Sequence, residues 1–489
     1  MNDSDSEPKE YDVLVLGGGT AGTAAAANAQ AELGPEGRVA MFNKGELGGL
    51  CILRGCMPTK TMLHAAHLAH EAGHHHTPGV GRAELELDFP SVMQNQAAKV
   101  ARFKAAKLKG IANGGYEVID AYARFAGEGL VEADGQLYRF TKGAVIATGS
   151  SVSYPPIEGL DDVREAGLLL DSDDVMALTE RPASAIVLGG GAIGLELGLF
   201  LARMGTVVHM TNRSAFYSKI DPDIADEMAK VLAAEPNLTP VAPLQAQALR
   251  VVERDDGTRC VAFDVTFECE SLTLEADVFV CATGRDAVLE PLALDTVGVE
   301  RKGKSLVFDD EMRTTNPRIF VAGDATGEEQ ILHIANWEGK AAGLGAAEAP
   351  GDLAVERRLA MTVVFTDPPL ATIGMTEAEA RGAGHDPVAV LERFPETGRA
   401  ITMDVQHGCW KLVVERSTGE VLGSQILGPR ADDLVHAIST IMYYDGTVND
   451  MLEMPWYHPT LSEVALSLAR SAERERGKTP PAVAPKSVT

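Results

Sequence analysis

Two cysteines stand close together early in the chain, at Cys51 and Cys56, separated by four residues. Pro58 follows the second cysteine, and proline is favoured in the first turn of a helix. A thiol at a helix N-terminus is near the positive end of the helix dipole, which lowers its pKa and favours the thiolate. The spacing therefore predicts a redox-active thiol pair at the start of a helix. Two ordinary buried cysteines are the alternative that the pair alone leaves open.

A glycine-rich turn precedes this pair and indicates a nucleotide-binding element. The apolar run 11–16 predicts a buried strand, and an alanine-rich helix is expected to end near Leu33. Between them, Gly17 would make the tight turn, Gly19 would let the backbone approach a pyrophosphate, and Gly22 would let helix and strand pack closely. The phosphates would then lie at the helix N-terminus.

The same pattern occurs a second time, later in the chain. Residues 185–188 predict a strand, Gly189, Gly191 and Gly194 repeat the glycine spacing, and the following helix is expected to reach Met204. Two such units in one chain are far more specific than one. They predict two nucleotides held by two domains.

The residue after the next strand indicates which nucleotide each unit takes, because an acidic side chain there binds a ribose hydroxyl. The first unit has Asn43 at this place, which can still accept a hydrogen bond without charge assistance. The second has Asn212 and Arg213, with Lys219 six residues on. Arginine accommodates the 2′-phosphate of NADP, so we expect NADPH, with NADH as the other possibility. Arg213 facing solvent is the other interpretation.

Further runs along the chain add candidate binding residues. Residues 144–149 end in Thr148 and Gly149, and a similar Ala-Thr-Gly ending recurs at Gly284. A buried strand is predicted for 314–324, ending in Asp324. This carboxylate could bind the ribityl hydroxyls of a flavin, or it could serve as a helix N-cap.

Histidines lie at helical spacing beyond the cysteine pair, at His64, His67 and His70, with three more at 74–76. Such spacing could gather a metal ion. A solvated or packed helix face is the more common arrangement, and we assign no metal site.

Composition limits the class of protein. The chain has 489 residues with a formal net charge of −27, which disfavours binding to nucleic acid and to anionic membranes. Six cysteines are too few for a disulfide scaffold. The acidic N-terminus has no targeting pattern, so we expect the reducing cytoplasm, where a disulfide is usually catalytic.

A linker signal and a change of composition suggest where the domains begin and end. Residues 150–160 predict a linker, and the composition changes near Asp352. The last helix is expected to begin at Trp456. Polar residues 1–10 and the Pro- and Ala-rich residues 476–489 predict disordered tails.

Taken together, these motifs resemble the class I pyridine nucleotide-disulfide oxidoreductases, which include glutathione reductase, dihydrolipoamide dehydrogenase and mercuric reductase. The resemblance covers about residues 11–470. It rests on the cysteine stretch, both glycine motifs, both Ala-Thr-Gly segments, the Phe-Val-Ala-Gly-Asp strand and the His-Pro-Thr-x-Ser-Glu ending.

The resemblance implies an α/β fold with two Rossmann-like dinucleotide-binding domains and a C-terminal α+β dimerisation domain. The FAD domain would comprise 11–155 and 285–350, the NAD(P) domain 156–284, and the dimerisation domain 351–475. The implied protein is a homodimer.

The resemblance also implies a role for each reactive side chain. Cys56 would be the thiol on the flavin side, and Cys51 the thiol that attacks the substrate. Lys60 would lie near the flavin and pair with Glu196. The segment Leu-His-Ile-Ala around His333 is similar to a flavin-contacting segment of the dihydrolipoamide dehydrogenases.

His458, donated by the other subunit and oriented by Glu463, would be the acid/base. Chemistry supports this role, because disulfide exchange needs a thiolate attacker and a protonated leaving group. Histidine exchanges protons near neutral pH, and a carboxylate five residues later can fix its tautomer. In isolation, a packed or capping histidine would be the simpler interpretation.

Several residues depart from the family pattern. Leu50, Leu53 and Arg54 depart from the residues that the family usually has in the cysteine stretch. Residues 285–287 depart from the sequence motif that the family usually has at that position. Residues 27–30 lack the arginines usual in glutathione reductases. A C-terminal cysteine pair, expected of mercuric reductase, is absent from the sequence.

These observations predict a homodimeric, FAD-containing, NAD(P)H-dependent reductase of a small disulfide other than glutathione. An NAD-linked dihydrolipoamide dehydrogenase of a multienzyme complex is one rival. A flavin-dependent reductase of quinones or metal ions, with idle thiols, is another.

Overall fold

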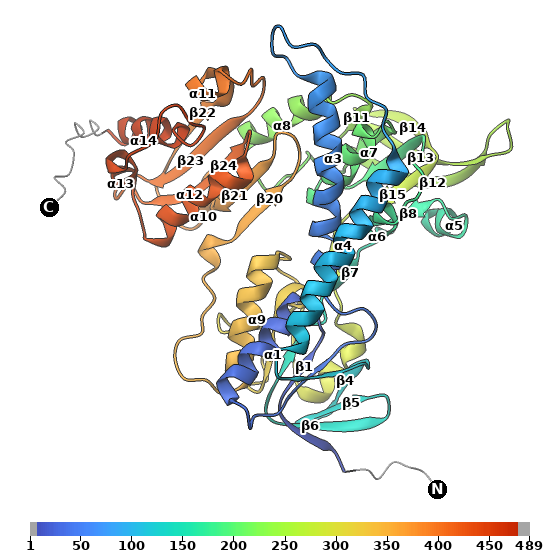
Figure 1. Ribbon diagram of the computed structural model, residues 1–489, viewed down its shortest axis with the longest axis vertical. Coiled ribbons are helices and arrows are strands. Elements are labelled where there is room, and N and C mark those ends of the chain that lie inside the picture. Colours follow the sequence, from blue (N-terminus) through green and yellow to red (C-terminus); the bar gives the residue numbers. More distant parts are fainter. Residues whose placement is uncertain (1–6, 478–489) are drawn as a thin grey trace. The chain divides into compact units, whose positions relative to one another are not determined.

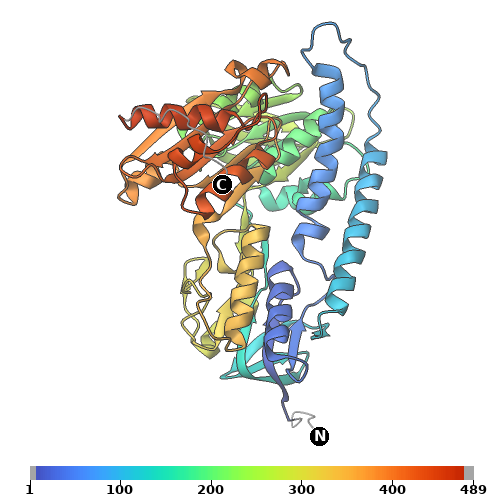
Figure 2. The same cartoon turned by 60° about the vertical axis from the view of Figure 1, so that its left-hand side comes forward.

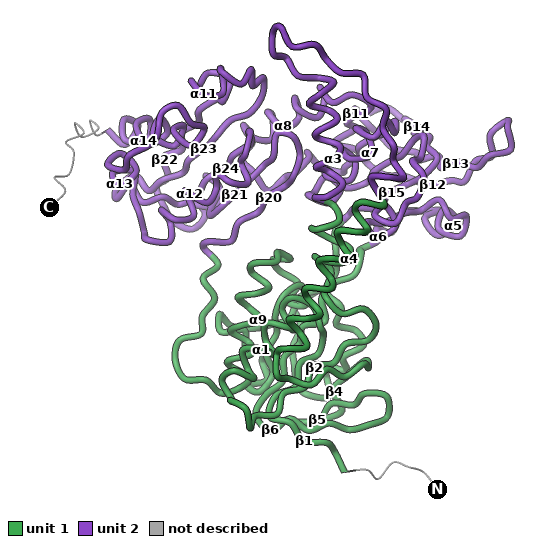
Figure 3. Tube along the Cα trace, viewed as in Figure 1, with its two compact units in different colours: residues 1–59, 94–153, 284–357 green, residues 60–93, 154–283, 358–489 purple. Residues whose placement is uncertain are grey.

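The computed structural model describes residues 7–477, and these form two compact units (Figures 1 and 3). Unit 1 is built from residues 1–59, 94–153 and 284–357, and unit 2 from 60–93, 154–283 and 358–489. Residues 1–6 and 478–489, which make up most of both predicted tails, lie outside the described part. The tail prediction was wrong at its inner edge, because strand β1 already begins at Lys9.

Unit 1 is organised around a sheet in the order β3-β2-β1-β6-β5-β4, with β19 paired to β6. Strands β1, β2, β3, β6 and β19 pair in parallel, whereas β4, β5 and β6 form an antiparallel meander. The bounds are β1 (Lys9–Leu16), β2 (Val39–Phe42), β3 (Glu117–Ile119), β4 (Ala123–Gly127), β5 (Leu130–Ala133), β6 (Gln136–Ile146) and β19 (Ile319–Val321).

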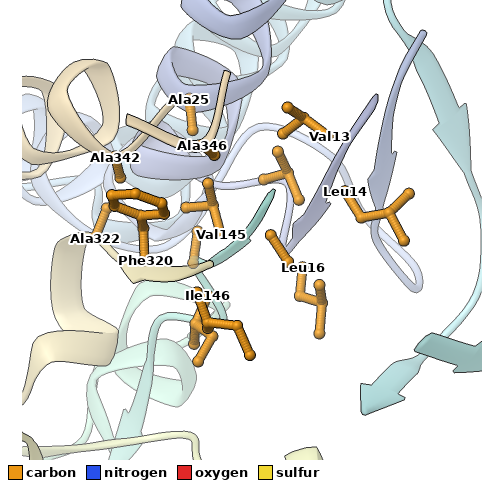
Figure 4. Close-up of a cluster of buried hydrophobic side chains, with 14 of the residues drawn as sticks. Val13, Leu14, Leu16, Ala25, Val145, Ile146, Phe320, Ala322, Ala342 and Ala346 are labelled. Carbon is orange, nitrogen blue, oxygen red and sulfur yellow. The ribbon is translucent and has the colours of Figure 1, made fainter. Parts of the chain in front are cut away.

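Helices α1 (Thr20–Leu33) and α9 (Leu332–Ala346) lie side by side in unit 1 (Figures 1 and 2). Small residues permit this approach, because a Cβ at Gly339 would lie 2.3 Å from the Ala21 carbonyl oxygen. Apolar side chains of these helices and of the sheet form the core shown in Figure 4, where Phe320 and Ala342 are labelled. Burial of this apolar surface holds the strand ends, and the loops that follow them, in fixed places.

Unit 2 contains a parallel sheet in the order β11-β10-β9-β15-β8 and an antiparallel sheet of β12, β13 and β14. The bounds are β8 (Leu169–Leu170), β9 (Ser184–Leu188), β10 (Val207–Thr211), β11 (Leu238–Val241), β12 (Leu244–Glu253), β13 (Arg259–Phe267), β14 (Glu270–Ala276) and β15 (Val278–Cys281). Its helices are α5 (Leu160–Glu165), α6 (Ser172–Met176), α7 (Ala192–Arg203) and α8 (Pro222–Ala234).

The C-terminal part of unit 2 is an antiparallel sheet in the order β20-β21-β24-β23-β22. Its strands are β20 (Met361–Val364), β21 (Leu370–Gly374), β22 (Pro387–Arg393), β23 (Cys409–Glu415) and β24 (Val421–Leu427). The helices are α10 (Glu377–Gly382), α11 (Gly398–Ile401), α12 (Ala431–Tyr443), α13 (Val448–Glu453) and α14 (Val464–Glu475). The last helix begins at Val464 and not at Trp456, because residues 456–463 form bends and a turn that include Pro459, which has no amide hydrogen to donate.

Buried ion pairs join this C-terminal sheet to the nucleotide-binding part of unit 2. The Lys411 ammonium lies 2.9 Å from the Asp223 carboxylate and 3.3 Å from that of Asp221. The Arg203 guanidinium bridges Glu235 and Asp367 at 2.8 Å each. The Lys411 ammonium and the Arg203 guanidinium are almost fully buried, and a cation so placed is stable only when it is paired. These contacts therefore fix α7 and α8 against the sheet.

Two predicted segments differ from the structure in extent. Residues 150–152, expected as linker, form β7 and pair with β16 (Arg285–Ala287). The strand predicted for 314–324 is reduced to β19, because Thr314 and Asn316 side chains hydrogen-bond to nearby backbone groups and form a turn before it.

Candidate active site

The two cysteines lie in unit 1, one on a short helix and one at the start of a long helix. Cys51 lies in α2 (Leu50–Leu53), and Cys56 is the first residue of α3 (Cys56–His74), as the sequence predicted. The Thr59 amide and hydroxyl both donate to the Gly55 carbonyl oxygen, which closes the first turn of α3. Cys56 is exposed and Cys51 is half-buried. Cys56 therefore has the helix-start position that stabilises a thiolate.

The first glycine turn has the shape that a dinucleotide requires. A Cβ at Gly17 would lie 2.0 Å from the Ala147 carbonyl oxygen, and one at Gly22 would lie 1.8 Å from that of Gly17. At Gly19, which caps α1, the nearest atom to such a Cβ is the Gly49 Cα at 3.9 Å. Two glycines thus permit close packing, while the third leaves its side open for a phosphate. These residues fit the pyrophosphate of FAD.

The second glycine turn, in unit 2, repeats this geometry. A Cβ at Gly189 would lie 2.1 Å from the Ala282 carbonyl oxygen, and one at Gly194 would lie 1.9 Å from that of Gly189. Gly191 caps α7 and has open space where a Cβ would point. The match between the two turns gives both of them the shape that a nucleotide phosphate requires.

An asparagine follows the second strand of each nucleotide unit. Asn43 accepts a hydrogen bond from the Gly18 amide at 3.2 Å, so its side chain braces the glycine turn itself. Asn212 instead donates to the Ser214 carbonyl oxygen at 3.0 Å. Arg213 and Lys219 are exposed, and are accessible to a nucleotide phosphate.

Asp324 and its neighbours come together at the end of β19 and β6 in unit 1. The Ser150 hydroxyl donates to the Asp324 carboxylate at 2.5 Å, and Arg285 donates to the Ser150 hydroxyl at 2.9 Å. Thr148, on the same loop as Gly149, donates to the Val288 carbonyl oxygen at 2.7 Å. The loop is thus held on both sides and presents Asp324 as a fixed carboxylate. Gly149 and Gly284 have positive φ angles of 73° and 116°, which favour glycine.

His333 lies in the first turn of α9, where its ring makes an edge contact with Trp337 at 5.9 Å between centroids. Both residues belong to unit 1, as does Asp324.

Lys60 and Glu196 form an ion pair in unit 2. The Lys60 ammonium donates to both Glu196 carboxylate oxygens, at 2.8 and 2.6 Å. The Phe365 amide donates to the same carboxylate at 2.9 Å, and the Lys60 ammonium lies 4.6 Å from the Phe365 ring centroid. The carboxylate is therefore satisfied and the lysine orientation is fixed.

His458 and Glu463 form a hydrogen-bonded pair in unit 2. The Nδ1 of His458 lies 2.8 Å from a Glu463 carboxylate oxygen, which holds the ring in one orientation. Three-quarters of the His458 side chain is exposed. Its other ring nitrogen is therefore available for proton exchange.

The histidine row on α3 is engaged in packing and ion contacts within unit 2. Burial lowers the pKa of His67 and of His70 to about 4. His70 lies 3.5 Å from the Glu235 carboxylate, which already holds Arg203. Among residues 7–477, no group of three or more histidine, cysteine or acidic side chains is placed to hold a metal.

Sequence reasoning missed two buried or half-buried groups near the candidate site in unit 1. Glu338 is fully buried on α9, accepts a hydrogen bond from the Gly323 amide at 2.7 Å and pairs with Arg357 at 2.6 Å. Lys107, on α4 (Phe89–Ala112), donates to the Thr23 hydroxyl at 2.8 Å. A signal that could have found them is a charged residue at a position where the helical periodicity predicts an apolar one.

In the described part of the chain, no helix has the length and apolarity needed to cross a membrane. A surface pocket of about 680 Å³ in unit 2 lies at Phe89 and Arg181 and contains none of the predicted site residues.

The profiles of two known protein families match most of the chain. Residues 11–339 match the pyridine nucleotide-disulphide oxidoreductase family, and residues 360–469 match the dimerisation domain of that family. The predicted fold class, with dinucleotide-binding folds followed by a dimerisation domain, is thereby confirmed.

Individual relatives span nearly the whole chain. Dihydrolipoyl dehydrogenase of Geobacillus stearothermophilus is 32% identical over 95% of this chain and 96% of its own length. Mercuric reductase of Streptomyces lividans is 33% identical over 94% of this chain and 95% of its own. The flavoprotein disulfide reductase RclA of Escherichia coli, solved as a Cu(II) complex, superposes with a TM-score of 0.80 at 25% identity over 95% of this chain and 99% of its own.

Relatives with different substrates thus share the fold, the redox-enzyme class and the use of FAD with a pyridine nucleotide. The chain belongs to the pyridine nucleotide-disulphide oxidoreductase family and is a flavin-dependent oxidoreductase that acts on sulfur groups.

Proposed function

We propose that the protein is a homodimeric, NADPH-dependent reductase of a small disulfide other than glutathione, and that it works in the cytoplasm. The observation that carries this proposal is the cysteine stretch itself. Cys56 begins α3 and Cys51 lies on the short helix before it, in a unit that also contains a dinucleotide-shaped glycine turn. A thiol pair at this place is suited to alternate between disulfide and dithiol.

The domain assignment of the proposal follows the family pattern. Residues 11–155 and 285–350 would bind FAD, 156–284 would bind NADPH, and 351–475 would form the dimer. Bound FAD would supply the two electrons of NADPH to the Cys51–Cys56 disulfide. Asp324 would hold its ribityl hydroxyls, and Lys60 would lie near its reactive ring.

The reduced pair would then exchange with the substrate disulfide in two steps. The Cys51 thiolate attacks one substrate sulfur, forms a mixed disulfide and releases the other half as a thiolate. His458 of the partner subunit gives that thiolate a proton. The Cys56 thiolate then attacks the Cys51 sulfur, which restores the disulfide and releases the second substrate half.

Exposed aromatic residues in the C-terminal part support the dimer. Tyr443, Tyr444 and Tyr457 expose 63%, 76% and 82% of their surface in the single chain. Tyrosines of this kind are enriched at protein interfaces, and Tyr457 directly precedes His458. A partner covering this surface would bring an acid/base to the site, so the dimer would be required for activity.

The nucleotide preference rests on Arg213. It is exposed just after β10, with no acidic residue at the place where NAD-linked enzymes hold the ribose. Its guanidinium can pair with a 2′-phosphate in a bidentate manner.

A dihydrolipoamide dehydrogenase is the second candidate. The 32% identity to an enzyme of that name favours it, and so does the similarity of the segment around His333 to a flavin-contacting segment of that enzyme class. NADH preference and turnover of lipoamide would establish it.

Steady-state turnover with NADPH and with NADH against lipoamide, oxidised glutathione, cystine, coenzyme A disulfide and thioredoxin tests the proposal. The wild type should reduce one small disulfide with NADPH, and Cys51→Ser should lose that activity while its flavin is still reduced. Cys269→Ser, which removes an exposed cysteine on a β-turn, is the matched control and should retain activity. Disulfide turnover that survives in Cys51→Ser would contradict the proposal.

A further inference from the structure

Helix α4 places two lysines one turn apart on the same face, and the two have different partners. Lys104 pairs with the Glu46 carboxylate at 2.6 Å, so its charge is neutralised locally. Lys107 donates to the neutral hydroxyl of Thr23 at 2.8 Å. The second ammonium lies half-buried against an uncharged partner.

The partner of Lys107 lies close to the cysteine stretch. Thr23 is in the first turn of α1, where its amide donates to the Gly19 carbonyl oxygen. The backbone of Gly49 lies against this same turn, because a Cβ at Gly49 would be 2.9 Å from the Gly19 Cα and 3.2 Å from the Thr20 nitrogen. Cys51 follows Gly49 by two residues.

We propose that Lys107 is a positioning residue for the redox pair, whose ammonium group stabilises the Cys51 thiolate by electrostatic attraction. This inference rests on the proposed role of Cys51 as the attacking thiol. Burial lowers the pKa of Lys107, and the negative Cys51 sulfur opposes that effect. Because attraction is reciprocal, Lys107 favours the thiolate form of Cys51 near neutral pH.

Other titratable groups face the same region and must be separated from this effect. The Cys56 thiol, five residues on at the start of α3, is present in every variant, so it does not account for a difference between them. Glu46 and Lys104 form a pair of opposite charges, and burial of neither is deep. The hydrogen bond from Lys104 is the main cause that holds the pKa of Glu46 below its usual range, and the charge of Arg54, which follows α2, acts in the same direction. Lys104→Met is therefore the matched control, because it removes a cation from the same helix face and leaves Lys107 in place.

The test measures the pH dependence of Cys51 alkylation by iodoacetamide. The cysteine pair of the holoenzyme is first reduced with dithiothreitol, and the modified Cys51 peptide is quantified by mass spectrometry. Lys107→Met should raise the pH midpoint of Cys51 alkylation by about one unit. The alkylation rate near neutral pH should then fall about tenfold, while the rate reached at high pH is unchanged. Lys107→Arg should keep the wild-type midpoint, and so should Lys104→Met.

An unchanged midpoint in Lys107→Met, or an equal shift in Lys104→Met, would overturn the inference. Flavin absorbance reports whether each variant folds. If Lys107→Met does not fold, Lys107→Gln replaces it, and the same shift of the midpoint is expected. Because dithiothreitol reduces the pair directly, the midpoint can be read even if NADPH-driven disulfide turnover fails. The two proposals therefore fail separately.

Discussion

The Lys60 ammonium and the Glu196 carboxylate meet at 2.6 Å and join α3 to α7 within unit 2. The Glu196 side chain is only 5% exposed, whereas Lys60 is 30% exposed. A carboxylate this buried depends on its cation, because solvent cannot stabilise the charge.

Lys60→Met should therefore lower the free energy of unfolding by about 3 kcal/mol, since it leaves a buried charge with only the Phe365 amide as partner. The double variant Lys60→Met/Glu196→Gln should recover part of this loss. Urea titrations of the holoenzymes measure both values. Lys104→Met breaks an exposed pair and should cost less than about 1 kcal/mol. Equal losses in the two single variants would contradict this explanation.

The glycines of the second nucleotide turn should respond differently to alanine. A Cβ at Gly194 would collide with the Gly189 carbonyl oxygen, so Gly194→Ala should lower the free energy of unfolding by about 3 kcal/mol or more. Gly191→Ala adds a methyl group in open space, so the melting temperature should not change. Its affinity for NADPH should fall at least about tenfold, because the methyl group occupies the place of a phosphate. Thermal melts and fluorescence binding titrations check the pair, and wild-type binding by Gly191→Ala would refute the phosphate assignment.

Arg213→Ala should reduce kcat/KM for NADPH by about 10- to 100-fold, the effect of losing a charge-assisted hydrogen bond. The value for NADH should stay within about twofold, because NADH has no 2′-phosphate. Steady-state kinetics with each nucleotide measure this. Arg259→Ala, an exposed arginine on β13, is the control and should change neither value. Parallel losses with NADPH and NADH would remove Arg213 from the specificity site.

Glu338 should make stability depend on pH. Burial raises its pKa from 4.5 to about 7, against the opposing effect of Arg357. The folded state therefore binds this proton more tightly than the unfolded state does. Its contribution is largest below about pH 4.5 and is lost as the pH rises through about 7, by up to about 3 kcal/mol.

Glu338→Gln removes this titration and isolates it from the other groups. The free energy of unfolding of the wild type, minus that of the variant, should be larger at about pH 5 than at about pH 8. Urea titrations at both values give the difference. A difference that is independent of pH would show that Glu338 keeps one protonation state.

The sequence predicted the helix that starts at Cys56, and both glycine turns with the strand before and the helix after each of them. These features are local: a thiol, a proline and glycines at fixed spacing determine a turn whatever surrounds it. The same reasoning was wrong for the start of the last helix and for residues 150–152. Pairing with the distant strand β16 makes residues 150–152 a strand, whereas Pro459 and the local turn at 462–463 delay the last helix to Val464.

The sequence by itself determined which residues can do chemistry, because side-chain type and spacing are written in it. The tertiary structure decided which charges are buried and what they face. The sequence pattern of the helices that carry Glu338 and Lys107 does not show which groups these side chains contact. Their hydrogen-bond partners, Gly323 and Thr23, lie outside those helices. The energy and the pKa of a charged group depend on its burial and on the groups beside it. For Glu338 and Lys107, both are set by how α9 and α4 pack in the folded chain.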